Sequence, residues 1–210
     1  MKTRSTGVTE TARASLAAAT MPAAVETFTL GDHSFSRVYL ESDGTFPNNP
    51  RFPVVVYRDV FSEARDGDGA ELLVRNGWTR PWAWGVFTYH HYHSTAWEAL
   101  LCVRGSADVQ FGGPSGPVLQ PAKGDLVLVP PGVAHKQLAD RDGFTLLGAY
   151  PSHDGCRTPS ADTVRGAPTA AQARNIAACA TPVLDPRWGG STPWEVGGRA
   201  REAARGARGV

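Results

Sequence analysis

The chain has 210 residues, with 21 Lys and Arg against 20 Asp and Glu and a formal net charge of +1. This length suffices for one domain with a sizeable core, and the balanced charge indicates neither a nucleic-acid nor a membrane partner. No apolar run approaches the 18 residues of a transmembrane helix. The spacing of Cys102, Cys156 and Cys179 fits neither a zinc motif nor a disulfide framework, so we expect reduced thiols and a cytoplasmic protein.

The first elements in chain order are short. Residues 1–27 are rich in Ala and Thr without a core pattern, which predicts a mobile N-terminal extension. β-Branched and aromatic residues predict short strands within 28–40 and 52–58. A short N-terminal helix is predicted towards the end of 62–76, because Gly77 is typical of the position after a helix.

A series of short strands follows, separated by Gly, Pro, Asp and Ser. The expected ranges are 84–93, 98–104, 106–111, 117–120, 125–130, 133–138 and 144–150. Many short strands at regular spacing are typical of an all-β sandwich or barrel, so 28–160 is predicted to be one β-barrel domain. We expect Val109 and Phe111, with Leu126 and Leu128 or their neighbours, to line its bore.

The sequence after Pro151 is irregular. We predict that 161–197 packs back on the barrel, because Trp188 and Trp194 would otherwise be exposed. The last residues, 198–210, are Arg-rich and nearly free of apolar side chains, which predicts a disordered tail.

Residues 90–98 read HHYHSTAWE and concentrate metal-ligating side chains. Strand alternation places His91 and His93 on one face, where they can chelate one ion, and turns His90 away. Glu98 follows in the next strand, and His135 can supply a third imidazole. Imidazole and carboxylate together suit Fe, Mn, Co, Ni, Cu or Zn. The alternative is that these are ordinary core or surface histidines.

Two segments resemble the cupin motifs. Residues 85–105, GVFTYHHYHSTAWEALLCVRG, resemble the first motif at all its fixed positions, which are Gly85, His91, His93, Glu98 and Gly105. Residues 124–139, GDLVLVPPGVAHKQLA, resemble the second motif at Gly124, Pro130, Gly132 and His135. Ala139 stands where the family often has Asn.

The resemblance implies an all-β cupin fold, a jelly-roll type double-stranded β-barrel. It also implies that His91, His93, Glu98 and His135 bind one metal ion. Residues from roughly 43 to 190 are similar to the small single-domain bacterial cupins called YjlB-like monocupins. Members of that family often have His before the motif Glu, where this chain has Trp97, and we interpret this as a large apolar group in place of a polar pocket group.

The ligand set predicts the function. Three His and one Glu leave positions open on an ion that prefers five or six ligands. We therefore expect a mononuclear metal-dependent cupin enzyme that acts on a small organic molecule, with oxidoreductase or dioxygenase-type chemistry. The alternatives are a zinc-type Lewis-acid isomerase or cyclase, a structural zinc, and a barrel that binds a metal or small ligand without turnover.

Further site residues are predicted from strand parity. Glu98 is a metal ligand and a candidate base. Gln137 shares the face of His135 and Tyr89 that of His91, so both are candidate catalytic residues. Cys102 is interpreted as a small buried hydrophobe. The tryptophans near the motif are either core and dimer residues or an aromatic wall for a flat substrate, and they are Trp78, Trp82, Trp84 and Trp97.

The expected partner is a second copy of the chain. Unpaired strand edges favour association, so we expect a homodimer to which strands within 28–60 contribute. Nucleic acid is not an expected partner, because the sequence shows neither a helix-turn-helix pattern nor a basic face.

Overall fold

The computed structural model describes residues 24–30, 33–60, 68–152 and 162–190. The predicted tail over 198–210, Trp194 and most of the predicted N-terminal extension lie outside these ranges. The described part of the predicted extension begins a strand, because the first β-ladder starts at Ala24 rather than at residue 28.

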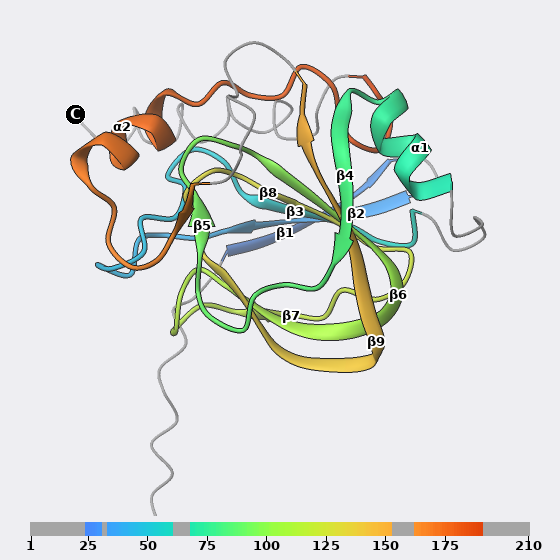
Figure 1. Ribbon diagram of the computed structural model, residues 1–210, viewed down its shortest axis with the longest axis horizontal. Coiled ribbons are helices and arrows are strands. Elements are labelled where there is room, and N and C mark those ends of the chain that lie inside the picture. The colour runs from blue at the N-terminus through green and yellow to red at the C-terminus, as the bar shows by residue number, and fades with distance from the viewer. Residues whose placement is uncertain (1–23, 31–32, 61–67, 153–161, 191–210) are drawn as a thin grey trace, which may run out of the picture.

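Antiparallel strands are the main regular structure of the described residues (Figure 1). The main sheet has the order β1-β2-β3-β8-β6-β9-β4, with β7 paired to β6, and β10 pairs with β5 in a small separate sheet. The strands are β1 (Ala24–Leu30), β2 (His33–Tyr39), β3 (Val54–Tyr57), β4 (Trp78–Trp84), β5 (Tyr92–His93), β6 (Glu98–Phe111), β7 (Val118–Leu119), β8 (Leu126–Val129), β9 (His135–Pro151) and β10 (Thr163–Val164). This all-β architecture confirms the jelly-roll type of fold.

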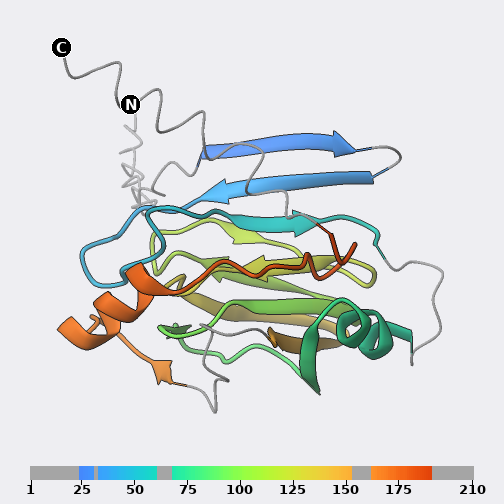
Figure 2. The same cartoon turned by 90° about the horizontal axis from the view of Figure 1, so that it is seen from above.

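Helix α1 (Asp68–Arg75) confirms the short helix predicted before Gly77. Helix α2 (Ala170–Ala178) lies in the segment predicted to be irregular, and a capping box between Thr169 and Gln172 begins it. The two helices lie at opposite ends of the sheet, and the chain after α2 runs from α2 towards α1 (Figure 1, Figure 2).

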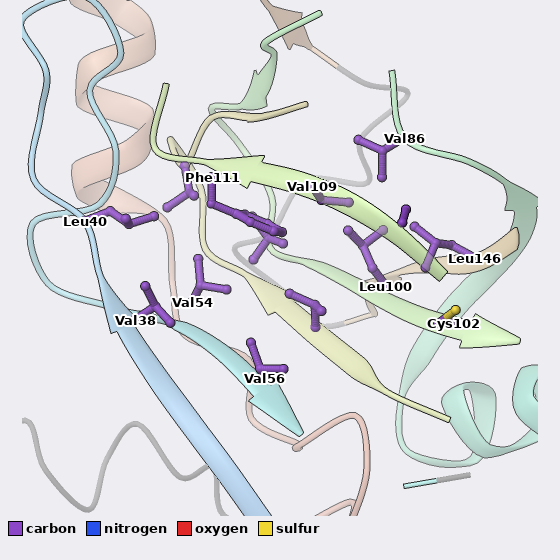
Figure 3. Packing of buried hydrophobic residues seen from close by; sticks show 14 of the residues in the cluster. Val38, Leu40, Val54, Val56, Val86, Leu100, Cys102, Val109, Phe111 and Leu146 are labelled. Carbon is purple, nitrogen blue, oxygen red and sulfur yellow. The ribbon is translucent and has the colours of Figure 1, made fainter. Parts of the chain in front are cut away.

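Alternation along β3 and β8 explains their unbroken apolar sequences, VVVY and LVLV. Successive side chains of a strand point to opposite faces, and both faces of the sheet are buried at these two strands. Val54, Val56, Val127 and Val129 belong to the inner cluster, where side chains of β2, β3, β6 and β9 point towards one another (Figure 3). Leu126 and Leu128 point to the opposite face, into an outer cluster that also contains Tyr57, Trp78 and Trp97. Their neighbours Val127 and Val129 therefore line the bore.

Several predicted strand limits were wrong. Residues 85–91 form no ladder beyond the bridge from His91 to His135, whereas the strand before them, β4, was not predicted. Pro81 lies inside β4, which is tolerated because β4 is an edge strand that pairs with β9 and shifts register between Thr79 and Trp82.

The ranges 98–104 and 106–111 form the single strand β6, which continues through Gly105. Gly105 has a φ of +64°, and a Cβ there would lie 2.3 Å from the carbonyl oxygen of Arg141. Glycine therefore permits an irregularity that does not end the ladder. The ranges 133–138 and 144–150 likewise join in β9.

The segment after β9 packs on the outer face of the sheet over its described residues, 162–190. The indole nitrogen of Trp78 donates to the carbonyl of Leu184, and the hydroxyl of Tyr57 donates to the carboxylate of Asp185. Trp188 packs against the outer cluster. No helix within the described ranges is long and apolar enough to cross a membrane.

Candidate metal centre

The structure brings His91, His93, Glu98 and His135 together. His91 bridges His135, the first residue of β9, while His93 lies on β5 and Glu98 begins β6. Ring nitrogens of the three buried histidines lie within 4.8 Å of one another, a group that can hold a metal ion. Oε1 of Glu98 lies 3.4 Å from Nε2 of His93, and Oε2 lies 3.3 Å from Nε2 of His135.

Backbone carbonyls orient the three imidazoles. A carbonyl oxygen can only accept a hydrogen bond, so the ring nitrogen that faces it carries the proton. The pairs are Nδ1 of His91 with Tyr89 (3.4 Å), Nδ1 of His93 with Asp162 (3.3 Å) and Nδ1 of His135 with Val133 (3.1 Å). In this tautomer each Nε2 carries a lone pair, the form in which imidazole binds a metal.

The donor set fits a divalent cation. Nitrogen lone pairs face the carboxylate oxygens of Glu98 at 3.3 and 3.4 Å, and Oε2 of Glu98 is buried without a hydrogen-bond partner among the described residues. Electron-rich atoms so placed repel one another unless a positive charge lies between them. Two ligands about 2.1 Å from one ion lie about 3.0 to 3.4 Å apart at angles between about 90° and tetrahedral.

The electrostatics of the cluster also favour a positive charge beside Glu98. Burial acts to raise the pKa of Glu98, but His93 and His135 outweigh it and hold that pKa well below its usual range. Burial acts to lower the pKa of His93, yet the Glu98 carboxylate raises it overall. Burial and the neighbouring His135 lower the pKa of His91 to about 2, so this imidazole stays neutral.

A cavity of about 210 Å³ borders the four residues. Its remaining lining is mostly apolar and aromatic, and consists of Trp82, Trp84, Gly85, Val86, Phe87, Leu100, Tyr150 and Thr163. The ring of Trp82 lies directly over Gly148, where a Cβ would come within 2.1 Å of the indole carbon Cζ2. The cluster therefore forms one wall of a space that a small molecule can enter.

Tyr150 contacts the cluster and was missed by the sequence analysis. Its hydroxyl donates to Oε1 of Glu98 at 3.1 Å. Burial and the Glu98 charge raise the pKa of Tyr150, while a hydrogen bond with Trp82 lowers it, so the hydroxyl stays protonated and can donate. Strand parity could have pointed to Tyr150, because Tyr150 shares a face of β9 with Leu146, a residue of the inner cluster.

Asp162 supports the cluster from a distant part of the chain. Its carbonyl accepts from His93, and its carboxylate accepts from the backbone nitrogen (2.8 Å) and the hydroxyl of Ser94. The next residues form β10, whose pairing with β5 places Thr163 opposite His93. No local pattern in the sequence pointed to Asp162, which precedes a two-residue strand.

Gln137 and Tyr89, the other predicted catalytic residues, are not in the described cavity lining. Oε1 of Gln137 accepts from the backbone nitrogen of Val86 at 3.2 Å and so holds the cavity wall. The rings of Tyr89 and Phe87 stack with 4.7 Å between their centroids, and Cζ of Arg165 lies 3.4 Å from the centroid of the Tyr89 ring. Their catalytic roles stay predictions.

The tryptophans near the motif divide between the two interpretations. Trp82 and Trp84 line the cavity, whereas Trp78 and Trp97 are buried in the outer cluster. The interpretation of Trp97 as a pocket group was wrong. Its ring packs on that of Phe52 with 5.1 Å between the centroids, and its indole nitrogen donates to the carbonyl oxygen of Ala180. Trp97 directly precedes β6 and is buried in the outer cluster, on the opposite side from the cavity that Glu98 lines.

His90 is not a member of the histidine cluster, and Cys102 is a core residue, as the sequence predicted. The ring of His90 turns away from the other histidines and packs on Phe46 at 5.4 Å. Cys102 is a buried member of the inner cluster, and burial raises the pKa of its thiol to about 12. Cys102 is therefore an inert core residue.

A jelly-roll sheet that carries this histidine and glutamate set defines a cupin. No family model matches the chain. Over 113 residues it is 42% identical to the uncharacterized protein YjlB of Bacillus subtilis (strain 168), a match that covers 54% of this chain and 67% of YjlB. The chain belongs to the YjlB-like family of small bacterial cupins.

Solved structures show weaker likeness. A cupin 2 domain-containing protein from Halorhodospira halophila is 15% identical with a TM-score of 0.28, over 75% of this chain and 77% of that chain. NovW, a 4-keto-6-deoxy sugar epimerase from Streptomyces spheroides, is 18% identical with a TM-score of 0.34, over 86% of this chain and 92% of that chain. These scores are too low to bear on the reaction of this chain.

Proposed function

We propose that this chain is a mononuclear metal-dependent cupin enzyme that acts on a small organic molecule, with oxidoreductase or dioxygenase-type chemistry. One observation carries the proposal: the four candidate ligands themselves line the cavity of about 210 Å³. A structural metal site is normally closed by protein ligands, whereas a catalytic one keeps a position open to substrate. An ion held here would face the space that the substrate occupies.

The donor set favours a redox-active ion. A divalent ion such as Fe(II) that prefers five or six ligands would keep one or two positions for dioxygen or substrate beside three imidazoles and a carboxylate. When bound, such an ion would supply the redox chemistry. The chain itself supplies apolar walls that exclude water, and the carbonyls that keep each Nε2 directed at the ion.

A second candidate is Lewis-acid chemistry of the isomerase or cyclase type, with Zn as the ion. The hydrogen bonding of Glu98 favours it. Tyr150 donates to Oε1, whereas Oε2 has no hydrogen-bond partner among the described residues. An oxygen without a hydrogen-bond partner can accept a proton from a substrate when Glu98 is not bound to the ion.

Elemental analysis tests the proposal. Protein purified without a polyhistidine tag should carry close to one Fe, Mn, Co, Ni or Cu per chain, and a His91→Ala/His135→Ala variant should lose it. Stoichiometric Zn lost in the same way would favour the isomerase or cyclase alternative. Absence of metal from the wild-type protein, even after reconstitution, would contradict both enzymatic proposals and leave a barrel that binds a small ligand.

A further inference from the structure

The size of the cavity limits its occupant. A protein cavity of about 150 Å³ with apolar walls accommodates benzene, and this one measures about 210 Å³. The space therefore suits one six-membered ring with one or two small substituents. A larger substrate would extend past Trp84, which lines the cavity and is 54% exposed.

The walls favour a flat occupant. The rings of Trp84 and Phe87 meet edge to face with 4.9 Å between their centroids, and the indole ring of Trp82 fills the space beside Gly148. Aromatic rings make their best contacts with planar partners, in stacked or edge-to-face arrangements. A puckered aliphatic ring of the same size would contact these walls less completely.

The charges in the cavity select against anions away from the metal. The described lining contains no Lys or Arg, and Glu98 is its only carboxylate. A second anionic group on the substrate would be buried against apolar walls without a partner, which is strongly unfavourable. A divalent ion and the Glu98 carboxylate together carry one positive charge, which one anionic oxygen would neutralise.

We infer that the substrate is a planar single-ring compound with one acidic hydroxyl, of the phenol or enol class, and with no further charged group. The hydroxyl faces the metal and the ring lies against Trp82, Trp84 and Phe87. The orientation of the hydroxyl rests on the proposed function, whereas the preference for a flat, uncharged ring rests on the walls alone.

Three matched probes separate these features. 4-Methylphenol has the inferred shape and charge, 4-hydroxybenzoate adds a remote carboxylate, and 4-methylcyclohexanol is not planar. Their binding is measured by ligand-detected NMR titration, with the protein as purified and after dialysis against a chelator, and circular dichroism checks the fold of both samples. We expect 4-methylphenol to bind at least about tenfold more tightly than the other two in both samples, a difference of about 1.4 kcal/mol.

Variants locate the binding site. Trp84 is 54% exposed, so Trp84→Ala should leave the fold intact and weaken 4-methylphenol binding about fivefold to tenfold, as expected for one aromatic contact. Leu138→Ala is the matched control, because Leu138 is also exposed but lies outside the described cavity lining. It should bind 4-methylphenol as the wild type does.

The outcomes distinguish this inference from the proposed function. One outcome is that 4-methylphenol binds more tightly than the other two probes, but removal of metal does not weaken its binding. This result would contradict the metal-facing hydroxyl and support the flat, uncharged ring. Equal binding of 4-hydroxybenzoate, or no binding of 4-methylphenol at about 10 mM, overturns the inference whatever the metal content. Equal effects of Trp84→Ala and Leu138→Ala overturn it as well.

Discussion

The hydroxyl of Tyr150 donates a hydrogen bond of 3.1 Å to Oε1 of Glu98, across the pairing of β9 with β6. This bond restricts the rotation of the carboxylate and leaves Oε2 directed at the histidine cluster, 3.3 Å from Nε2 of His135. Tyr150 is therefore a positioning residue for the candidate metal ligand Glu98.

Removal of that hydroxyl should weaken metal binding without unfolding the protein. Groups that orient a metal ligand typically contribute about 10- to 100-fold to affinity, so we expect Tyr150→Phe to weaken metal binding by about 10-fold. Isothermal titration with the metal found in the purified protein measures the change. Tyr92→Phe is the matched control, because the Tyr92 hydroxyl is buried without a hydrogen-bond partner among the described residues. Equal losses in both variants would argue against positioning by Tyr150.

Asp162 should act on the same site through Ser94 and His93. Asp162→Ala removes the carboxylate that accepts two hydrogen bonds from Ser94, so β10 is held less firmly against β5 and His93 loses orientation. We expect about a 10-fold loss of metal affinity. Asp108→Ala, which removes an exposed ion pair with Arg141, should leave affinity unchanged. Wild-type affinity in Asp162→Ala would show that the backbone alone positions His93.

Gly148 should be intolerant of any side chain because Trp82 occupies that space. In Gly148→Ala the new Cβ would lie 2.1 to 2.7 Å from three indole carbons, so either the ring or β9 must move. We expect a loss of about 1 to 3 kcal/mol in the free energy of unfolding, measured by urea denaturation. Gly190→Ala is the control, because a Cβ there meets no atom within 4 Å. Wild-type stability in Gly148→Ala would mean that Trp82 moves freely.

Asp185 predicts a pH-dependent gain in stability on substitution. Burial raises its pKa, although the hydrogen bond from Tyr57 and the backbone nitrogens of Arg187 and Trp188 act against it. When folding raises the pKa of a carboxyl, the protonated form stabilises the folded protein. This stabilisation is complete below the pKa of about 3.9 in the unfolded chain, and it is lost as the pH rises through the higher pKa in the folded protein. Asn resembles the protonated carboxyl, so Asp185→Asn should avoid that loss.

The measurement is the difference in Tm between the Asp185→Asn variant and the wild type at two pH values. It should be more positive at pH 7 than at pH 4, and about 2 to 4 °C corresponds to about 1 kcal/mol in a chain of this size. Asp142→Asn, at an exposed position, should show the same difference at both pH values. A Tm difference for Asp185→Asn that falls from pH 4 to pH 7 would contradict the prediction.

The β1 edge of the sheet predicts a homodimer. β1 pairs with β2 and with no other described strand, and Val25 on this strand is 58% exposed. An unpaired edge with an exposed apolar residue favours pairing with a second chain. Sedimentation analysis should show a dimer for the wild type, weakened by Val25→Lys and unaffected by Val118→Lys, where Val118 is 46% exposed on β7. A monomeric wild type would contradict this prediction.

The strand limits show where a local pattern misleads. The strand β4 was not predicted, and it contains Pro81 because an edge strand has one side without ladder hydrogen bonds. Gly105 appeared to separate two strands, yet β6 continues through it. Both outcomes depend on how the neighbouring strand pairs with β4 or β6. The residues close in sequence to Pro81 and Gly105 do not indicate that pairing.

The sequence by itself identified the residues that meet at the candidate metal centre. His91 and His93 share a face because side-chain alternation is a property of extended backbone, and the motif spacing added Glu98 and His135. Only the tertiary structure brought Tyr150 to Glu98 and Asp162 to His93, over separations of 52 and 69 residues. Those contacts are decided by the register of β9 on β6 and of β10 on β5, which depends on how the whole sheet packs.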